Sequence, residues 1–291
     1  MRRPGNRANP ENTSNGETNM RTQMEKARLF RALHEKPGAF IIPNPWDAGT
    51  ARLLASLGFE ALATTSLGLA NTLGSTAVSL DAIVDNCRVI AEATDLPVNA
   101  DLENCGAHDP ETAALAIGMA AQAGAVGGSI EDATGDPAKP IYDFDHAVER
   151  VRAAVEAAHT LPFPFMLTAR AENLLHGRND LDDTIRRLQA FEAAGADVLY
   201  APGVRDLATI RTVLSALNKP FNLVIGFADP TLTLDQLSAA GVKRISVGGA
   251  LSRVAMAAFM KSAREMKHQG AFTFIREMAP IQDLRDGFAA R

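Results

Sequence analysis

Charged side chains stand at the ends of three successive apolar runs in this chain. In order they are Asp101 with Glu103, then Glu131, then Arg170 with Glu172. A carboxylate is costly to bury unless it is paired or bound to a metal. The C-terminal ends of strands are also where parallel α/β folds bind their ligands. The pattern therefore predicts a divalent metal ion that holds an anionic substrate.

The acidic residues have the chemistry of a magnesium site. Mg²⁺ prefers oxygen ligands, keeps several of its waters and usually takes only one or two protein carboxylates directly. Asp101 and Glu103 are two residues apart, so on a regular strand their side chains would share a face. We expect Asp101, Glu103 and Glu131 to hold the metal, either directly or by orienting its waters. The alternative is that these acids cap helices or lie in surface loops.

Arg170 ends an otherwise apolar run, which makes it the predicted substrate anchor. Its planar guanidinium can hold a substrate carboxylate through two parallel hydrogen bonds. An internal ion pair with Glu172 or Glu131 is the alternative, and the two roles can coexist. Arg170, Glu131 and Asp101 are accordingly the predicted catalytic residues, and Glu172 is placed with the substrate-binding group.

The elements that position these groups follow a βαβ pattern. Short apolar runs alternate with amphipathic stretches, which is typical of a parallel sheet. Strands are predicted at 39–43, 61–65, 98–101, 126–131, 165–170, 198–201, 222–225 and 244–247. Helices are predicted at 48–57, 80–93, 110–123, 144–158, 181–194, 204–217, 234–239 and 251–268.

Eight such units without a linker predict an α/β protein that forms a single (β/α)8 TIM barrel over residues 21–291. An extra helix at 20–34 is expected to cap the bottom of the barrel, and the segment 272–288 is expected to be helical. Residues 1–20 are polar, lack the apolar core of a secretory signal, and are expected to form a disordered tail.

Composition favours an enzyme that acts on small molecules. A chain of 291 residues that is 46% hydrophobic can bury a large core. The net charge of -5 gives no reason to expect nucleic acid or an anionic membrane as a partner. No apolar run reaches the length of a membrane span. Only Cys87 and Cys105 are present, which argues against a disulfide framework and favours the cytoplasm.

Five short motifs, in this order and spacing, resemble the isocitrate lyase/phosphoenolpyruvate mutase superfamily. They are Ile42-Pro43-Asn44-Pro45-Trp46-Asp47-Ala48, Ala63-Thr64-Thr65-Ser66-Leu67-Gly68, Asp101-Leu102-Glu103, Ser129-Ile130-Glu131-Asp132 and Thr168-Ala169-Arg170. The resemblance implies a modified TIM barrel, often with a helix exchanged between the subunits of a dimer or tetramer. It also implies Mg²⁺, an α-oxo or α-hydroxy carboxylate substrate, and a C–C or P–C bond that is broken or formed through an enolate-like species.

The same resemblance implies roles for single residues. Asp101 would bind the metal directly, and Arg170 would bind the substrate carboxylate. The segment Thr65, Ser66, Leu67 and Gly68 would be a loop whose backbone N–H groups and hydroxyl receive the carboxylate and the oxo oxygen. Asp47 is expected either to line the same mouth or to cap the helix that follows it.

The chain departs from the superfamily's lyases in several motifs; for example, segment 222–227 lacks the glutamate that those lyases carry after their seventh strand. Those lyases carry Lys-Lys-Cys-Gly-His after the fourth strand, where the cysteine is the acid/base, but segment 133–142 here has neither cysteine nor histidine. Cys105-Gly106-Ala107-His108 follows the third strand instead, and we interpret its likeness to that motif as coincidence. Segment 135–142, with Lys139 and Tyr142 as its proton donors, is either a gating loop or a solvated connection.

The sequence thus predicts a Mg²⁺-dependent lyase that cleaves a C–C bond in a small α-oxo or α-hydroxy di- or tricarboxylate, oxaloacetate-like in character. It is expected to work as a homo-oligomer, with a C-terminal helix exchanged or packed between subunits. The first alternative is the P–C bond chemistry of a phosphonopyruvate mutase or hydrolase. The second is a barrel that binds an oxo acid without turning it over.

Overall fold

The computed structural model describes residues 20–289, so the predicted tail at 1–20 lies, apart from Met20, outside the described residues. Eight parallel strands form one sheet with the order β1-β8-β7-β6-β5-β4-β3-β2. They are β1 (Phe40–Ile42), β2 (Leu62–Ala63), β3 (Val98–Asp101), β4 (Gly127–Glu131), β5 (Met166–Arg170), β6 (Val198–Tyr200), β7 (Phe221–Val224) and β8 (Arg244–Ser246).

The sheet closes on itself between its first two strands. The backbone N–H of Ala63 in β2 donates to the carbonyl of Pro43, just after β1, at 3.0 Å. On the other side, β1 pairs with β8 in parallel register. The predicted (β/α)8 barrel is therefore confirmed.

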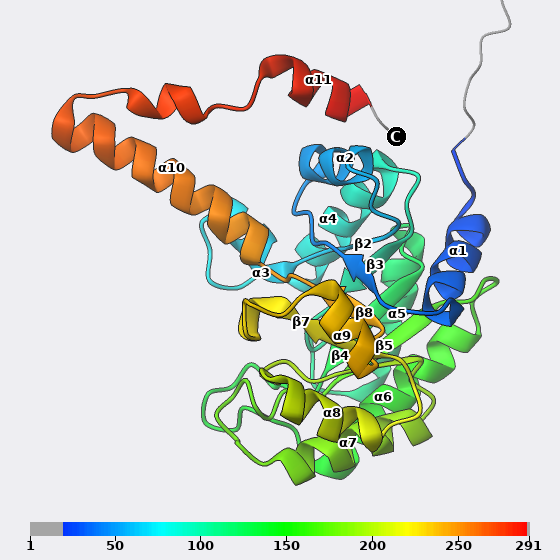
Figure 1. The fold of residues 1–291 in the computed structure, drawn as a ribbon. Coiled ribbons are helices and arrows are strands. Elements are labelled where there is room, and N and C mark those ends of the chain that lie inside the picture. Colours follow the sequence, from blue (N-terminus) through cyan, green and yellow to red (C-terminus); the bar gives the residue numbers. More distant parts are fainter. Residues whose placement is uncertain (1–19, 290–291) are drawn as a thin grey trace, which may run out of the picture.

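Helices surround the strands as an outer layer (Figure 1). Those that follow the predicted pattern are α2 (Ala48–Ser56), α4 (Leu80–Ala93), α5 (Pro110–Gln122), α6 (Phe144–His159), α7 (Leu181–Ala193), α8 (Leu207–Ser215), α9 (Leu234–Ala240) and α10 (Ala250–Gln269). Side-chain caps start most of them; at α5, Asp109 Oδ1 accepts from the Thr112 N–H at 2.7 Å, and Pro110 occupies the first turn.

Two segments differ from the expected elements. Residues Ser66–Leu73 form a helix, α3, where a loop was expected, because Thr65 caps the Gly68 N–H with its hydroxyl. The segment 272–288, which was expected to be helical, does not form one continuous helix. It is split into a 3-10 turn, η2 (Thr273–Glu277), and α11 (Ile281–Ala289), since Pro280 between them has no N–H to continue a helix.

Helix α1 (Gln23–Glu35) covers the N-terminal end of the barrel, as predicted. Thr22 and Glu25 form a reciprocal capping box at its start. Its Ala27 and Phe30 are fully buried against residues at the beginnings of strands, such as Val126 and Val198. The bottom of the barrel is therefore sealed, and the opposite end remains for a ligand.

The last elements form an arm, defined here as residues 250–289. Helix α10 leaves the barrel, and the chain then turns back so that α11 packs on α2 (Figure 1). Only Ser252 of α10 is buried, while Val254, Phe259 and Met260 are exposed. None of the helices in the described part of the chain combines the length and apolar character needed to cross a bilayer.

Candidate active site

A cavity of about 220 Å³ lies inside the C-terminal end of the barrel. Among the predicted site residues, those that line it are Thr65, Ser66, Leu67, Asp101 and Arg170. The predicted residues that do not line it are Asp47, Gly68, Glu103, Glu131 and Glu172. The cavity thus contains the predicted substrate anchor and one of the predicted metal ligands.

Arg170 is the centre of a buried ion cluster at one wall of this cavity. Its Nη1 lies 2.9 Å from Asp101 Oδ1, its Nη2 3.0 Å from Glu131 Oε2, and its Nε 2.8 Å from Glu172 Oε1. The strand register explains part of this, because Glu131 at the end of β4 stands directly opposite Arg170 at the end of β5. The internal ion pairs considered for Arg170 are therefore present, and the guanidinium also faces the cavity.

Asp101 joins this cluster to the start of α3. Its Oδ2 accepts hydrogen bonds from the Ser66 backbone N–H at 3.0 Å and from the Ser66 hydroxyl at 2.9 Å. A carboxylate is stabilised at a helix N-terminus, where backbone N–H groups lack partners within the helix. The N–H of Gly68 is occupied in turn by the Thr65 hydroxyl. In this conformation the donors expected to receive substrate serve Asp101 and the helix cap.

Asp47 has the second of its two predicted roles. Its Oδ1 accepts from the Thr50 N–H at 2.7 Å and starts α2 with a reciprocal capping box. Its side chain therefore serves the helix that follows.

The carboxylates around Arg170 outnumber it, and burial raises their pKa values. Burial is the main cause of the pKa of Glu131 lying well above its ordinary value, and Arg170 opposes that shift only in part. Burial raises the pKa of Glu172 to about 7. For Glu103, burial and the neighbouring Asp101 both raise the pKa. The site therefore contains more acidic groups than its one arginine compensates.

This excess of oxygen donors fits a hard divalent cation. Within residues 20–289, no set of three or more His, Cys, Asp or Glu side chains is grouped as ligands of a metal ion. Mg²⁺ needs only one or two carboxylates and completes its shell with water. Asp101 is the carboxylate that faces the cavity. Ligation by Asp101, Glu103 and Glu131 together stays a prediction.

The loop after β3 is held in an unusual backbone conformation. Glu103 and Cys105 have positive φ angles of 50° and 62°, which side chains other than glycine rarely adopt. Arg150, buried in α6, holds this loop: its guanidinium donates to the carbonyls of Asn104, of Ala107 at 2.9 Å and of Glu131 at 3.2 Å. Arg150 thereby fixes the loop that carries Glu103 against the end of β4.

Asp132, directly after Glu131, belongs to a second ion cluster behind the first. Its Oδ1 accepts from the Glu172 N–H at 2.7 Å, and its Oδ2 lies 3.1 Å from Arg187 Nη1. Arg187 in α7 also pairs with Asp183 at 2.9 Å. Asp183 in turn pairs with Arg186, whose side chain is exposed. A chain of contacts, one backbone hydrogen bond followed by three ion pairs, thus runs from Glu172 to the outer surface.

The structure supports the interpretation of Cys105 and His108 as a coincidental motif. Cys105 is fully buried and burial raises the pKa of its thiol to about 12, which does not suit an acid/base group near neutral pH. His108 Nδ1 contacts the Tyr142 hydroxyl at 2.7 Å, outside the cavity. Lys139 pairs with Asp143, so neither proposed proton donor of segment 135–142 reaches the cavity in this conformation.

Several polar cavity residues were missed in the sequence. They are Asn44, Asn99, Tyr200, Asn222 and Arg244. Asn44 Oδ1 accepts from the backbone N–H groups of Val247 and Gly248, both at 2.9 Å, and so holds the turn after β8. The available signal was a polar residue inside each short apolar run, at positions such as Asn99, where an apolar residue would be expected.

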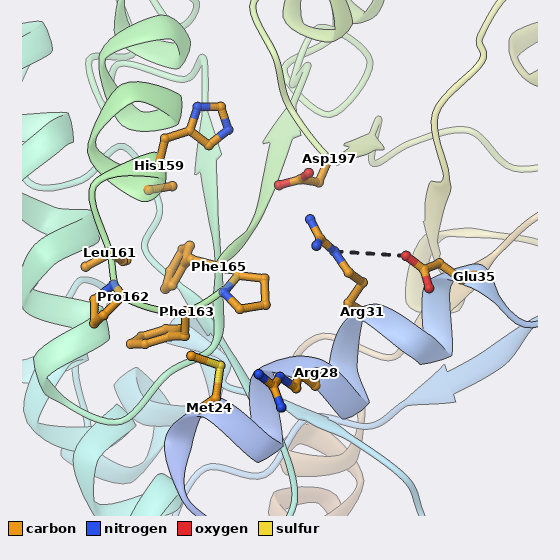
Figure 2. Close-up of a pocket in the computed structure, with 12 residues that line it drawn as sticks. Met24, Arg28, Arg31, Glu35, His159, Leu161, Pro162, Phe163, Phe165 and Asp197 are labelled. Atoms are coloured by element: carbon orange, nitrogen blue, oxygen red, sulfur yellow. Dashed lines mark ion pairs between the residues drawn. The ribbon is translucent and has the colours of Figure 1, made fainter.

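A larger hollow of about 560 Å³ lies at the other end of the barrel, between α1 and the loop before β5. Figure 2 shows its mixed lining, in which Arg31 pairs with Glu35 at 4.0 Å and aromatic Phe163 and Phe165 lie nearby. It lies away from the C-terminal strand ends, where barrels of this type place their chemistry. The smaller cavity is therefore the candidate active site.

The region of this chain that matches a known protein family includes all eight strands of the barrel. Residues 30–267 match the phosphoenolpyruvate phosphomutase family. The 2-methylisocitrate lyase of Escherichia coli (strain K12) is 30% identical over 83% of this chain and 82% of its own. The oxaloacetate decarboxylase of Bradyrhizobium diazoefficiens is 27% identical over 79% of each chain. The crystal structure of a Burkholderia cenocepacia J2315 protein assigned as a lyase/mutase is 57% identical, with a TM-score of 0.90 over 92% of this chain and 97% of that one.

Proposed function

The chain belongs to the isocitrate lyase/phosphoenolpyruvate mutase superfamily, and from this premise we propose that it is a Mg²⁺-dependent lyase that cleaves a C–C bond in a small α-oxo or α-hydroxy di- or tricarboxylate. The supporting observation is Arg170, which faces the cavity while three carboxylates fix its position. A guanidinium preorganised in this way can bind a substrate carboxylate without first paying for its own ordering.

The chemistry requires stabilisation of an oxyanion. When a C–C bond next to a carbonyl group breaks, one fragment departs as an oxo compound or as carbon dioxide. The bonding electron pair stays on the other fragment as an enolate, whose charge rests on the carbonyl oxygen, and a proton must later be added to carbon. A bound Mg²⁺ supplies positive charge for that oxygen and for the adjacent carboxylate. Asp101 would hold the ion, and Glu103 and Glu131 would bind it directly or orient its waters. Arg170 would hold the substrate carboxylate beside Ser66.

The absence of the lyase cysteine from segment 133–142 restricts the substrates that we expect. Of the described residues that line the cavity, none is a cysteine or a histidine, whereas Ser66, Ser129 and Tyr200 bring hydroxyl groups. Burial raises the pKa of Tyr200 well above its ordinary value, so at neutral pH it remains a hydrogen-bond donor. We therefore expect a substrate other than isocitrate or 2-methylisocitrate, oxaloacetate-like in size and charge.

The test is a substrate panel assayed with excess Mg²⁺ and again with a chelator. Oxaloacetate, substituted malates and phosphonopyruvate are compared, and oxalate serves as an enolate mimic. We expect C–C cleavage of one dicarboxylate that requires the metal and is inhibited by oxalate. Phosphate release from phosphonopyruvate would assign P–C chemistry instead. Turnover that persists in the chelator would contradict the role of the metal.

We also infer that the chain forms a homo-oligomer, a dimer or a tetramer, through its C-terminal arm. The exposed apolar residues Val254 and Phe259 lie on α10, and Phe272 and Met278 lie between α10 and α11, along the arm that projects from the barrel. An exposed apolar surface of this kind is typical of an interface between proteins. A second copy of this chain is the partner that we propose.

A further inference from the structure

Arg244 is a charged side chain buried in the barrel interior, at the beginning of β8. It is 3% exposed and lines the candidate active-site cavity. Its Nε donates to Asn222 Oδ1 at 2.8 Å, and its Nη2 donates to Thr168 Oγ1 at 2.9 Å. Its Nη1 lies 3.5 Å from a ring nitrogen of His34. All of these partners are uncharged side chains.

No carboxylate in the described part of the chain forms an ion pair with Arg244. Arg150 and Arg187 are also buried and Arg170 is partly buried; Arg170 and Arg187 have acidic partners, and Arg150 donates to three backbone carbonyls. Burial lowers the pKa of Arg244 to about 9, so the guanidinium is still protonated at neutral pH. A buried charge without a counter-charge is unfavourable. The presence of the Arg244 guanidinium in a cavity therefore indicates that the cavity binds an anionic ligand.

Asn99 is a second, independent sign of a missing polar partner. It is 3% exposed, it lines the same cavity, and its Oδ1 has no hydrogen-bond partner. Unpaired buried polar atoms are uncommon and call for an explanation such as a ligand group or a water. The unpaired atom is a hydrogen-bond acceptor, which a water or a hydroxyl group would satisfy, so Arg244 is the group in the cavity interior that attracts an anion.

Tyr200 connects this interior to the mouth of the cavity. The Arg170 guanidinium carbon lies 4.9 Å from the centre of the Tyr200 ring. Tyr200 and Arg244 both line the cavity. Arg170, Tyr200 and Arg244 therefore line one cavity.

We propose that Arg244 binds the second carboxylate of a dicarboxylic substrate whose oxo-acid end is held by Arg170 and Ser66. This rests on the proposed function and specifies the substrate class: dicarboxylates are selected over acids with one carboxylate. A carboxylate paired with a buried guanidinium is stabilised as an anion. It is therefore expected to stay on a product and not to leave as carbon dioxide.

The sharpest test changes Asn222 to aspartate. Asn222→Asp places a carboxylate of nearly the same shape beside Arg244 Nε and supplies the missing counter-charge from within the protein. We expect the KM for the dicarboxylic substrate to rise at least about 10-fold. Oxalate, which reaches only the mouth, should bind within about two-fold of wild type, and the melting temperature should not fall. Asn222→Ser, which adds no charge, is the matched control and should keep most of the selectivity.

An unchanged ratio of dicarboxylate KM to oxalate affinity in Asn222→Asp would overturn the role of Arg244 and leave the proposed function intact. If none of the substrates in the panel is turned over, calorimetry on the wild-type protein tests separately whether the cavity binds a second carboxylate. A four-carbon dicarboxylate should then bind at least about 10-fold more tightly than the monocarboxylate of equal length. Equal affinities would overturn the inference, and the same comparison applies if the variant does not fold.

Discussion

Asp101 has two tasks that no other residue shares: it faces the cavity and it ties Arg170 to the start of α3. We predict that Asp101→Ala lowers Mg²⁺-dependent turnover by roughly 10³-fold, because both the metal ligand and the position of Arg170 are lost. Steady-state kinetics over a range of Mg²⁺ concentrations measures this. Asp182→Ala, on the exposed face of α7, is the control. Full activity in Asp101→Ala would refute the metal assignment.

Glu172 provides a pH-dependent test, since its side chain is 1% exposed and burial raises its pKa to about 7. A raised pKa means that its stabilising contribution is complete below about pH 4.5 and is lost as the pH rises through about 7. Without metal, the free energy of unfolding should therefore fall by roughly 1–3 kcal/mol between about pH 5 and about pH 8.

Glu172→Gln should remove a large part of this decline, because the amide keeps an acceptor for Arg170 and cannot ionise. Thermal or urea unfolding in the presence of a chelator measures the two pH profiles. Parallel profiles for the variant and the wild type would show that Glu172 does not titrate in this range.

At the level of the elements, Arg150 stabilises the loop after β3 through three backbone carbonyls. We predict that Arg150→Met costs about 2–4 kcal/mol of unfolding free energy, because buried carbonyls lose charged donors. Amide hydrogen exchange in residues 102–107 should increase at the same time. Arg152→Met, two residues along the same helix and exposed, should change neither quantity. Unaltered exchange in the loop would contradict the role given to Arg150.

The sequence predicted most elements because apolar periodicity alone determines them. Strand β3 and helix α4 have the predicted bounds, since Val98 begins a buried run and Ser79 caps a strongly amphipathic segment. Helix α3 was missed because Thr65, Ser66 and Gly68 are also ordinary turn residues. The Thr65 hydroxyl caps the helix locally, and the contact between Asp101 and the Ser66 N–H adds a long-range hydrogen bond at the helix start. Such long-range hydrogen bonds leave no local signal.

In the candidate site, too, some residues have a local sequence signal and others are recognised only from the tertiary structure. Arg170 and Asp101 could be found because a charge at the end of an apolar run is conspicuous. Arg244 and Asn222 were missed because they lie at the start of their strands, and a polar residue there is usually solvated. Their burial follows from α1, which covers that end of the barrel and converts surface positions into interior ones.

For the whole molecule, the arm predicts association. Phe259 on α10 is 71% exposed, and no part of the described chain covers it. We predict that Phe259→Glu shifts the assembly toward smaller species, because a charge replaces an apolar contact. Light scattering coupled to size-exclusion chromatography measures the mass. Leu115→Glu, at a similarly exposed apolar position on α5, should leave the mass unchanged. A wild-type protein that elutes as a monomer would contradict the proposal.

The backbone N–H of Glu172 is bonded to Asp132, and from Asp132 a chain of ion pairs through Arg187 and Asp183 ends at the solvent-exposed Arg186. Selection acting on the outside of α7 therefore has a route to the acidity of the reaction centre. Related enzymes can diverge in their optimum pH through changes that leave every wall of the pocket untouched.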